Sequence, residues 1–305
     1  MVAEFCSKKL QELIAFVQFQ PVISLCICVM NVLFSFVATI GNLLVIRALW
    51  KASSITATLK KLFLSLAFCD LAVGVFSHPT LAVTIAVLQD KAKNGLYAFF
   101  CPTVITVVMA PTFLLLGVSF SLIAAIAVDR LLAVSLHLRY QELVTEKRVT
   151  IGLTVIWFNN SLLTLTFMSL PSHNDLVTVT CLTVGLILVT VVYFRIYLVV
   201  RYHQNQIHGQ NQIQNGQAMQ AARAKKSALN ALYVYIVSLV CFTPNLLAGI
   251  LLVVDNSSMP TLVAYSASVF LALLNSSLNP LVYCWRYREI RDTVKNTVKK
   301  IFDRN

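Results

Sequence analysis

Charged residues are scarce in this 305-residue chain, at 12% against about 25% in soluble domains. Glycine is scarce as well, with nine residues, and no glycine-rich cofactor-binding loop is present. Hydrophobic residues make up 58%, and the mean hydropathy is +0.78. The net charge of +12 could indicate nucleic-acid binding, but the basic residues fall between apolar runs rather than in one patch. The composition therefore indicates a membrane protein without a nucleic-acid partner.

Seven apolar runs are each near or above the ~20 residues that cross a bilayer as a helix. They are 22–49, 62–88, 97–133, 149–171, 176–202, 226–254 and 260–285. The third run is too long for the hydrocarbon alone, so we expect it to protrude. The break at 171–175 is interpreted as a very short outer loop, with a single re-entrant segment as the alternative. These runs predict an all-α membrane protein with a seven-helix bundle.

Lysine and arginine are distributed unevenly between the two predicted sides of the membrane. Lys8, Lys9, Lys91 and Lys93 fall on one side, and the other basic residues fall at the opposite ends and loops. Since the basic side of a membrane protein is cytoplasmic, we expect a multi-pass plasma-membrane protein. Its parts would be an extracellular N-terminus (1–21), a seven-helix domain (22–285) and a cytoplasmic helix and tail (286–305).

Three segments outside the runs have their own patterns. No cleavable signal peptide is visible in residues 1–20, and 7–19 is either an amphipathic helix on the membrane surface or a frayed tail. Residues 203–222 are polar and broken by two glycines, which predicts a flexible linker; continuation of the fifth helix is the alternative. After residue 286, apolar residues recur at helical spacing among basic ones. This predicts a short amphipathic eighth helix on anionic membrane lipids.

Polar side chains inside membrane spans are costly and indicate function. Such residues occur here at similar predicted depths: Asn42, Asp70, Ser119, Asn275 and Asn279. Asn275 and Asn279 are four residues apart and so lie on one helix face. They form either a plain interhelical hydrogen-bond network or a site around Asp70 for a sodium ion or water cluster. No other metal or cofactor is expected.

Three spans carry further polar or helix-breaking residues. Arg130 follows Asp129, which can serve as its partner; a snorkelling arginine at the interface is the alternative. Pro244 kinks the sixth run beside Phe242. The seventh run contains Asn279-Pro280 and ends near Tyr283, and a proline in a span is tolerated only where neighbouring groups satisfy the freed backbone.

Taken together, these residues resemble the rhodopsin-like G-protein-coupled receptors. One landmark in each of six helices matches, namely Asn42, Asp70, Arg130, Trp157, Pro244 and Pro280. The segments 138–140 and 193–196 look most like adenosine receptors, whereas the very short outer loop and Gly185 look more like melanocortin receptors. The resemblance places the chain near the melanocortin, lysophospholipid, cannabinoid and adenosine receptors.

The resemblance implies a receptor, not an enzyme, that carries the signal of an extracellular small ligand to a heterotrimeric G protein. The coupling and activation residues that it implies are Asp129, Arg130, Tyr193, Tyr283, Pro244 and Phe242. In the family, the arginine is held at rest and is freed when the sixth helix swings outward. Ala224 stands where a carboxylate often holds that arginine, so measurable basal signalling is expected.

The resemblance also implies a ligand pocket, and its lining residues would be Thr112, Phe113, Leu116, Asn245, Tyr265 and His78. Thr112 stands where amine receptors carry an aspartate, so a monoamine would leave its ammonium unpaired. Gly249, Ala272 and Leu273 replace polar residues of adenosine receptors, which disfavours adenosine. A lipid-like or small neutral ligand is expected. The alternatives are a ligand-independent, constitutively active or heterodimerising receptor and, less favoured, a transporter.

The predicted outer side carries one modification signal. Asn256-Ser257-Ser258 is a glycosylation sequon between the sixth and seventh runs, so Asn256 is the candidate glycosylation site. Cys101 lies about one turn further out than the family's disulfide cysteine, and the outer loop at 172–175 offers it no partner cysteine.

Overall fold

The structure, a computed structural model, describes residues 2–91, 104–136, 139–169, 174–209, 215–254 and 258–303. Seven helical segments are long and apolar enough to cross a membrane: Pro21–Lys51, Ala57–Gln89, Val107–Leu136, Glu146–Ser169, Asp175–Tyr202, Leu229–Val254 and Met259–Arg286. The predicted all-α bundle is confirmed, and six predicted runs agree with these spans within about five residues. The third described span, Val107–Leu136, ends three residues beyond the predicted 133, and its predicted start at 97 lies outside the described residues.

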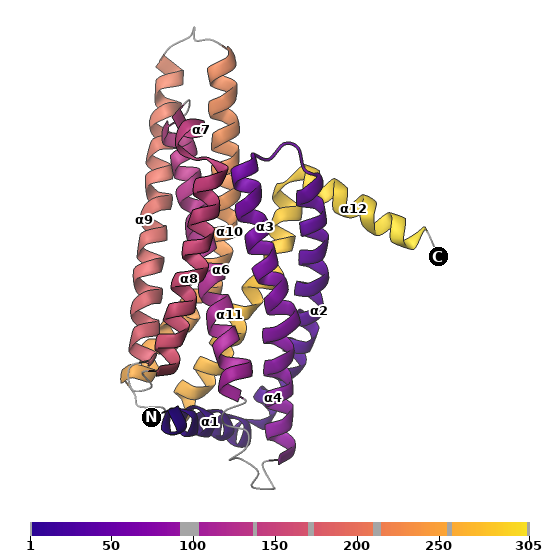
Figure 1. Cartoon of the computed structure of the whole chain (residues 1–305), viewed down its shortest axis with the longest axis vertical. Helices are drawn as coiled ribbons and strands as arrows, with labels where there is room; N and C mark the ends of the chain where they lie inside the picture. The colour runs from indigo at the N-terminus through magenta and orange to yellow at the C-terminus, as the bar shows by residue number, and fades with distance from the viewer. Residues whose placement is uncertain are drawn as a thin grey trace.

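The helices follow one another as an up-and-down bundle with one helix across an end (Figure 1). The first half contains α1 (Val2–Phe19), α2 (Pro21–Lys51), α3 (Ala57–Ala72), η1 (Val73–Ser77), α4 (His78–Lys91), η2 (Val104–Met109), α6 (Ala110–Leu136) and α7 (Tyr140–Leu143). The second half contains α8 (Glu146–Ser169), α9 (Asn174–Gly209), α10 (Asn215–Val254), α11 (Met259–Arg286) and α12 (Arg288–Phe302). We call the two ends of the bundle the α1 end and the α12 end.

Apolar side chains cover much of the outer surface of the spans. Ile151, Phe158 and Leu165 on α8 are largely exposed, as are Ile187 and Leu188 on α9. Lipid, not water, surrounds such surfaces in a membrane protein. The buried core runs between α3, α6, α10 and α11. α8 and α9 each pack against α6 far more than against each other.

Two π-helical stretches interrupt the spans, and a proline follows shortly after each of them. η1 ends two residues before Pro79, and η2 ends two residues before Pro111. A proline has no N–H to donate, and its ring clashes with the carbonyl four residues earlier, so the preceding turn widens. One extra residue in a turn rotates everything beyond it by roughly 100° about the helix axis.

The first helix, α1, packs against the bundle instead of lying free. It crosses the α1 end in contact with α2, α4 and α11 (Figure 1). The buried side chains of this contact are Leu10, Phe16, Val17, Ile27, Ile85 and Leu88. Neither alternative for residues 7–19, a surface helix or a frayed tail, describes this packing.

The predicted linker at 203–222 is wrong over most of its length. α9 continues to Gly209 and α10 begins at Asn215, so only residues 210–214 lie outside the described helices. Glutamine, asparagine and alanine in this stretch are compatible with a solvent-exposed helix, and continuation of the fifth helix was the better alternative.

The predicted amphipathic eighth helix is present as α12, which leaves the bundle at an angle (Figure 1). Its first turn is fixed by Glu289. The Glu289 carboxylate accepts hydrogen bonds from the backbone nitrogens of Ser53 (2.7 Å) and Ser54 (3.1 Å) and from both hydroxyl groups. Hydrogen bonds to a carboxylate favour its charged form, and those from Ser54 and Ser53 lower the pKa of Glu289 to about 2.

Gly74 marks the closest approach between η1 and α2. A Cβ at this position would lie 2.8 Å from the backbone nitrogen of Thr39 and 2.9 Å from Cβ of Ala38. The carbonyl of Gly74 also accepts a hydrogen bond from the Ser35 hydroxyl at 2.7 Å. The two helices therefore need a residue without a side chain here.

We expect Gly74→Ala to lower the free energy of unfolding by about 1–3 kcal/mol, because the added methyl pushes α2 away from η1. Gly152→Ala is the matched control, since a Cβ there meets nothing within 4 Å. That control should be neutral or stabilising by up to about 1 kcal/mol. Thermal unfolding of the purified protein in detergent measures both, and equal melting temperatures would contradict the close contact.

Candidate functional site

The carboxylate of Asp70 lies in the middle of the bundle and is fully buried. Its Oδ1 accepts a hydrogen bond from the Ser119 hydroxyl at 3.4 Å. Its Oδ2 accepts one from Nδ2 of Asn279 at 2.8 Å. The three side chains come from α3, α6 and α11, so the structure brings together the centre of the predicted polar network.

The other two predicted members, Asn42 and Asn275, bind neighbouring groups. Nδ2 of Asn42 donates to the backbone carbonyl of Ser276 at 3.0 Å, which joins α2 to α11. Oδ1 of Asn275 accepts from the Ser238 hydroxyl at 2.9 Å, which joins α11 to α10. Asn275 thus belongs to a separate contact one turn away from Asn279, and its predicted place beside Asp70 is not seen.

Two buried oxygen atoms near Asp70 have no hydrogen-bond partner among the described residues. They are Oδ1 of Asn42 and Oδ1 of Asn279. Because buried polar atoms are normally paired with protein or ordered water, such oxygens suit a monovalent cation or a water cluster. The donor set of one carboxylate and neutral oxygens also fits a hard cation such as sodium.

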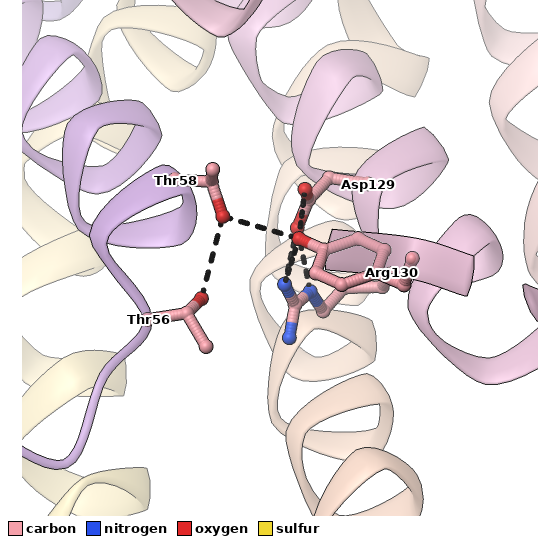
Figure 2. A network of polar contacts seen from close by, with 5 residues as sticks. Thr56, Thr58, Asp129 and Arg130 are labelled. Atoms are coloured by element: carbon pink, nitrogen blue, oxygen red, sulfur yellow. Dashed lines mark hydrogen bonds and ion pairs between the residues drawn. The ribbon is translucent and has the colours of Figure 1, made fainter. Parts of the chain in front are cut away.

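At the α12 end, Arg130 is held by its neighbour on α6 (Figure 2). Its Nε donates to Oδ2 of Asp129 at 2.9 Å, and a second nitrogen makes an ion pair with the same oxygen. Arg130 is 4% exposed and Asp129 is 5% exposed. A snorkelling arginine would keep its guanidinium in water, so that alternative is excluded.

Tyr140 on α7 completes this contact, although no sequence pattern predicts a functional role for it. Its hydroxyl donates to Oδ1 of Asp129 at 2.6 Å and lies 3.2 Å from the hydroxyl of Thr58. Burial and the charge of Asp129 raise the pKa of Tyr140 to about 12, so the phenol keeps its proton and remains a donor. Figure 2 shows Thr58 reaching this network from α3.

The part of α10 nearest the α12 end is held by two contacts that the sequence did not predict. The Tyr193 hydroxyl donates to the backbone carbonyl of Ala231 at 2.9 Å, which ties α9 to α10. Nε of Arg286 donates to Oδ1 of Asn230 at 3.0 Å, and its guanidinium carbon lies 4.2 Å from the ring centre of Tyr233. Hydrogen bonding and cation–π attraction act together here.

Tyr283 lies in α11 and Pro244 in α10, at the places predicted for them. The ring of Tyr283 packs against Phe63 at a centroid distance of 5.1 Å. Its buried hydroxyl has no partner among the described residues. Pro244 lies inside α10, where it removes one backbone hydrogen bond. The side chain of Ala224 lies outside the described part.

A cavity of about 460 Å³ lies between α6, α8, α9, α10 and α11 and reaches α1. Five of the predicted pocket residues line it, namely Thr112, Phe113, Leu116, Asn245 and Tyr265. Phe242 also lines the cavity. The Thr112 hydroxyl is buried without a partner in the described part of the chain. The volume falls in the range of about 300–1,000 Å³ that is usual for small-ligand sites.

His78 is the predicted pocket residue that does not line this cavity. It is fully buried, and its Nδ1 lies 2.8 Å from Oδ1 of Asn31 on α2. The expected pocket role is therefore wrong, since the widened turn of η1 rotates the residues that follow it. A buried imidazole needs a polar partner, and Asn31 supplies one.

Phe242 contacts a second aromatic residue at the base of the cavity. Its ring meets that of Phe120 edge-on at a centroid distance of 5.3 Å. The Phe120 ring occupies the space that a side chain at position 185 would fill, so Gly185 lets α6 and α9 approach each other. The predicted glycosylation site Asn256 and the cysteine Cys101 lie outside the described residues.

Comparisons with known proteins give a consistent result. The sequence matches the family described as 7 transmembrane receptor (rhodopsin family) over residues 41–181 and 171–283. It is 25% identical to adenosine receptor A3 of Ovis aries over 288 residues, with 86% of each chain covered. It is 27% identical to adenosine receptor A2a of Homo sapiens over 297 residues, covering 86% of this chain and 69% of that receptor. It is 25% identical to adenosine receptor A2b of Gallus gallus over 317 residues.

We expect Tyr140→Phe to lower the free energy of unfolding by about 1.5–3 kcal/mol, because Asp129 loses a buried hydrogen bond to a charged group. Tyr197→Phe is the matched control, since the side chain of Tyr197 is 55% exposed on the lipid-facing surface of α9. Thermal unfolding of the purified proteins measures the difference. If both variants melt at the same temperature as the parent, the Tyr140 hydroxyl does not support the Asp129–Arg130 pair.

Proposed function

The chain belongs to the rhodopsin family of seven-transmembrane receptors, and on that premise we propose that it transmits a small-molecule signal from outside the cell to a heterotrimeric G protein. The α1 end faces the extracellular side of the plasma membrane, and the α12 end faces the cytoplasm. Support for this orientation comes from the basic residues, which concentrate towards the α12 end. The ligand occupies the 460 Å³ cavity.

The contact that carries the proposal is the buried pair of Asp129 and Arg130. A fully desolvated arginine is costly unless it is paired, so its release requires a rearrangement of the helices around it. α10 lies beside this region and is held by the Tyr193–Ala231 and Arg286–Asn230 contacts. When these contacts open, α10 moves outward, and Arg130 becomes accessible to the G protein.

The hold on α10 changes the expectation for basal activity. Ala224 offers no carboxylate to Arg130, yet Arg286 supplies a different anchor from α11. The Arg286 contact is partly solvated, so its loss costs on the order of 1 kcal/mol. A free-energy change of that size shifts the ratio of active to resting receptor roughly fivefold. The parent receptor therefore has low but measurable basal exchange.

The cavity walls favour a lipid-like or small neutral ligand. Most of the lining is apolar or aromatic, and the partnerless Thr112 hydroxyl offers one polar contact on α6. The described lining has one carboxylate, Glu12 on α1, and none on the α6 wall, so the ion pair that amine receptors make on the third span cannot form at Thr112.

Adenosine fits this cavity poorly, although the relatives reported above are named adenosine receptors. Gly249 stands where their asparagine would, and a Cβ there would lie 2.9 Å from Cγ2 of Val179. Ala272 and Leu273 are buried and outside the lining residues. The polar groups that would bind a nucleoside are thus absent from these described positions. The family match supports a receptor rather than the transporter alternative.

We further propose that Asp70 with Ser119 and Asn279 binds sodium and that the ion favours the resting state. A cation that binds one conformation better than another shifts the population by its differential affinity. The partnerless oxygens of Asn42 and Asn279 support this proposal.

Sodium should raise the melting temperature of the parent receptor relative to potassium at equal ionic strength, and Asp70→Asn should abolish the difference. The reason is that the neutral amide lacks the charge that attracts a cation. Asp292→Asn, on the exposed side of α12, is the matched control and should keep the sodium response. A sodium effect of the same size in Asp70→Asn and in the parent would place the ion elsewhere.

Nucleotide exchange on purified G proteins in reconstituted membranes tests the receptor function. We expect Arg286→Ala to raise basal exchange roughly fivefold, because α10 loses its anchor to α11. Arg288→Ala, two residues further on and largely exposed, is the matched control and should leave exchange unchanged. Arg130→Ala should abolish exchange in either background. Equal exchange in the parent and in every one of these variants, with receptor amounts confirmed by labelling, would refute coupling through Arg130.

A further inference from the structure

The cavity is roofed at the α1 end by the first helix. Glu12, Leu13 and Phe16 of α1 line it directly. Phe16 is 1% exposed, so this part of the roof is packed rather than loosely laid on the bundle. Nε2 of Gln89 anchors the turn after α1 by donating to the carbonyl of Pro21 at 3.1 Å and to the Ser24 hydroxyl at 2.9 Å.

An aromatic contact between α6 and α8 forms a second part of the roof. Phe113 and Phe167 stack face to face with ring centres 4.4 Å apart. Both line the cavity, one near the start of α6 and the other near the end of α8. Stacked aromatic rings are among the stronger apolar contacts between helices. A ligand that comes from water at this end meets packed side chains in the described part of the roof.

On its far side, the same cavity is bounded by α8 and α9, and one of its lining residues is exposed on the outer surface. Cys181 lines the cavity and is also exposed. Leu163 on α8 and Leu182 on α9 line the cavity beside this seam and are partly exposed. A side chain that touches both the cavity and the outer surface marks an opening between them.

This opening lies at the depth of the lipid chains. Cys181 is six residues into the span Asp175–Tyr202, which places it about 9 Å below the end of a helix about 42 Å long. The hydrocarbon core is ~30 Å thick, so a centred span puts Cys181 just inside it. α8 and α9 pack mainly on α6 and little on each other, which lets a chain pass between them.

We propose that the ligand is a neutral single-chain lipid and that it reaches the cavity from the bilayer through the seam between α8 and α9 at Cys181. The inference rests on the proposed function, because it assigns the ligand and its route to the same cavity. An apolar chain in the bilayer is already desolvated and reaches the apolar walls without crossing water.

Two polar groups select the head of this lipid. The buried Thr112 hydroxyl has no partner in the described part of the chain and pairs with a hydroxyl or amide group of the ligand. Glu12 is the one charged residue among the described lining residues. Its negative charge repels a phosphate or carboxylate head. Hydroxyl- or amide-headed lipids therefore bind, and fatty acids of the same chain length do not.

The experiment follows binding of a fluorescently labelled monoacylglycerol, delivered in phosphatidylcholine vesicles to the receptor in proteoliposomes. Cys181→Trp fills the opening and should slow both association and dissociation roughly tenfold. Val184→Trp is the matched control, since Val184 is 50% exposed on α9 and does not line the cavity. It should bind at the parent's rate.

A reversible block gives the same test without a mutation that could disturb folding. Benzyl methanethiosulfonate should slow binding to the parent, dithiothreitol should restore it, and Cys181→Ser should not respond. The labelled fatty acid of equal chain length should bind at least tenfold more weakly than the monoacylglycerol, and Glu12→Gln should narrow that gap.

Four results would overturn the inference. Equal rates in the parent, Cys181→Trp and Val184→Trp would exclude the opening at Cys181. Faster binding in Leu13→Ala, with no effect of Cys181→Trp, would place the route at the α1 end. Equal affinity for the fatty acid would refute the head selection. If neither lipid binds the parent while the receptor still drives nucleotide exchange, the ligand class fails but the receptor function stands.

Discussion

A buried carboxylate needs hydrogen-bond donors from the helices around it, and Asp70 is such a carboxylate in the middle of this bundle. Ser119 from α6 and Asn279 from α11 donate to it, and Asn42 joins α2 to the same level of α11. Leaving a buried polar group unpaired costs several kcal/mol in a lipid-like interior. The relative heights of α2, α3, α6 and α11 are therefore fixed by polar pairs, whereas apolar packing alone would allow them to slide.

The α12 end is organised differently, because its contacts are spread over helices that can separate. Arg130 is buried and paired within α6 and to Tyr140, whereas the hold on α10 rests on one tyrosine hydroxyl and one arginine at the rim. The ion pair and the Tyr193 hydrogen bond are shielded from solvent, whereas the Arg286–Asn230 contact is partly solvated and weaker. This gradient allows α10 to move while the central polar network stays in place.

The sequence predicted the spans and the centre of the polar site well, because the signals are local. Hydropathy over about 20 residues defines a span, and the depth of Asp70, Ser119 and Asn279 follows from counting along each span. Asn275 was misplaced because four residues raise it by about 6 Å along α11, which brings it level with Ser238. His78 was misplaced because the π-helical turn before Pro79 is invisible to a regular 3.6-residue pattern.

The remaining features depend on contacts that no local pattern encodes. Polar composition does not separate a helix from a coil, so the pattern of 203–222 predicts a linker where α9 and α10 continue. Tyr140 lies in a short connection with no depth signal, and its role appears only once Asp129 is beside it. The packing of α1 needs Ile85 and Leu88, which come more than sixty residues later.

That distance along the chain has a consequence for biogenesis. α1 leaves the ribosome first, yet its packing surface includes Val263, Ala267 and Phe270 of α11, the last span to be made. Translation proceeds from the N-terminus at ~5–20 residues per second. The apolar face of α1 therefore lacks its α11 partners for many seconds after α1 is made. The roof of the cavity is completed only when every other span is in place, and a seated α1 therefore distinguishes a finished receptor from an unfinished one.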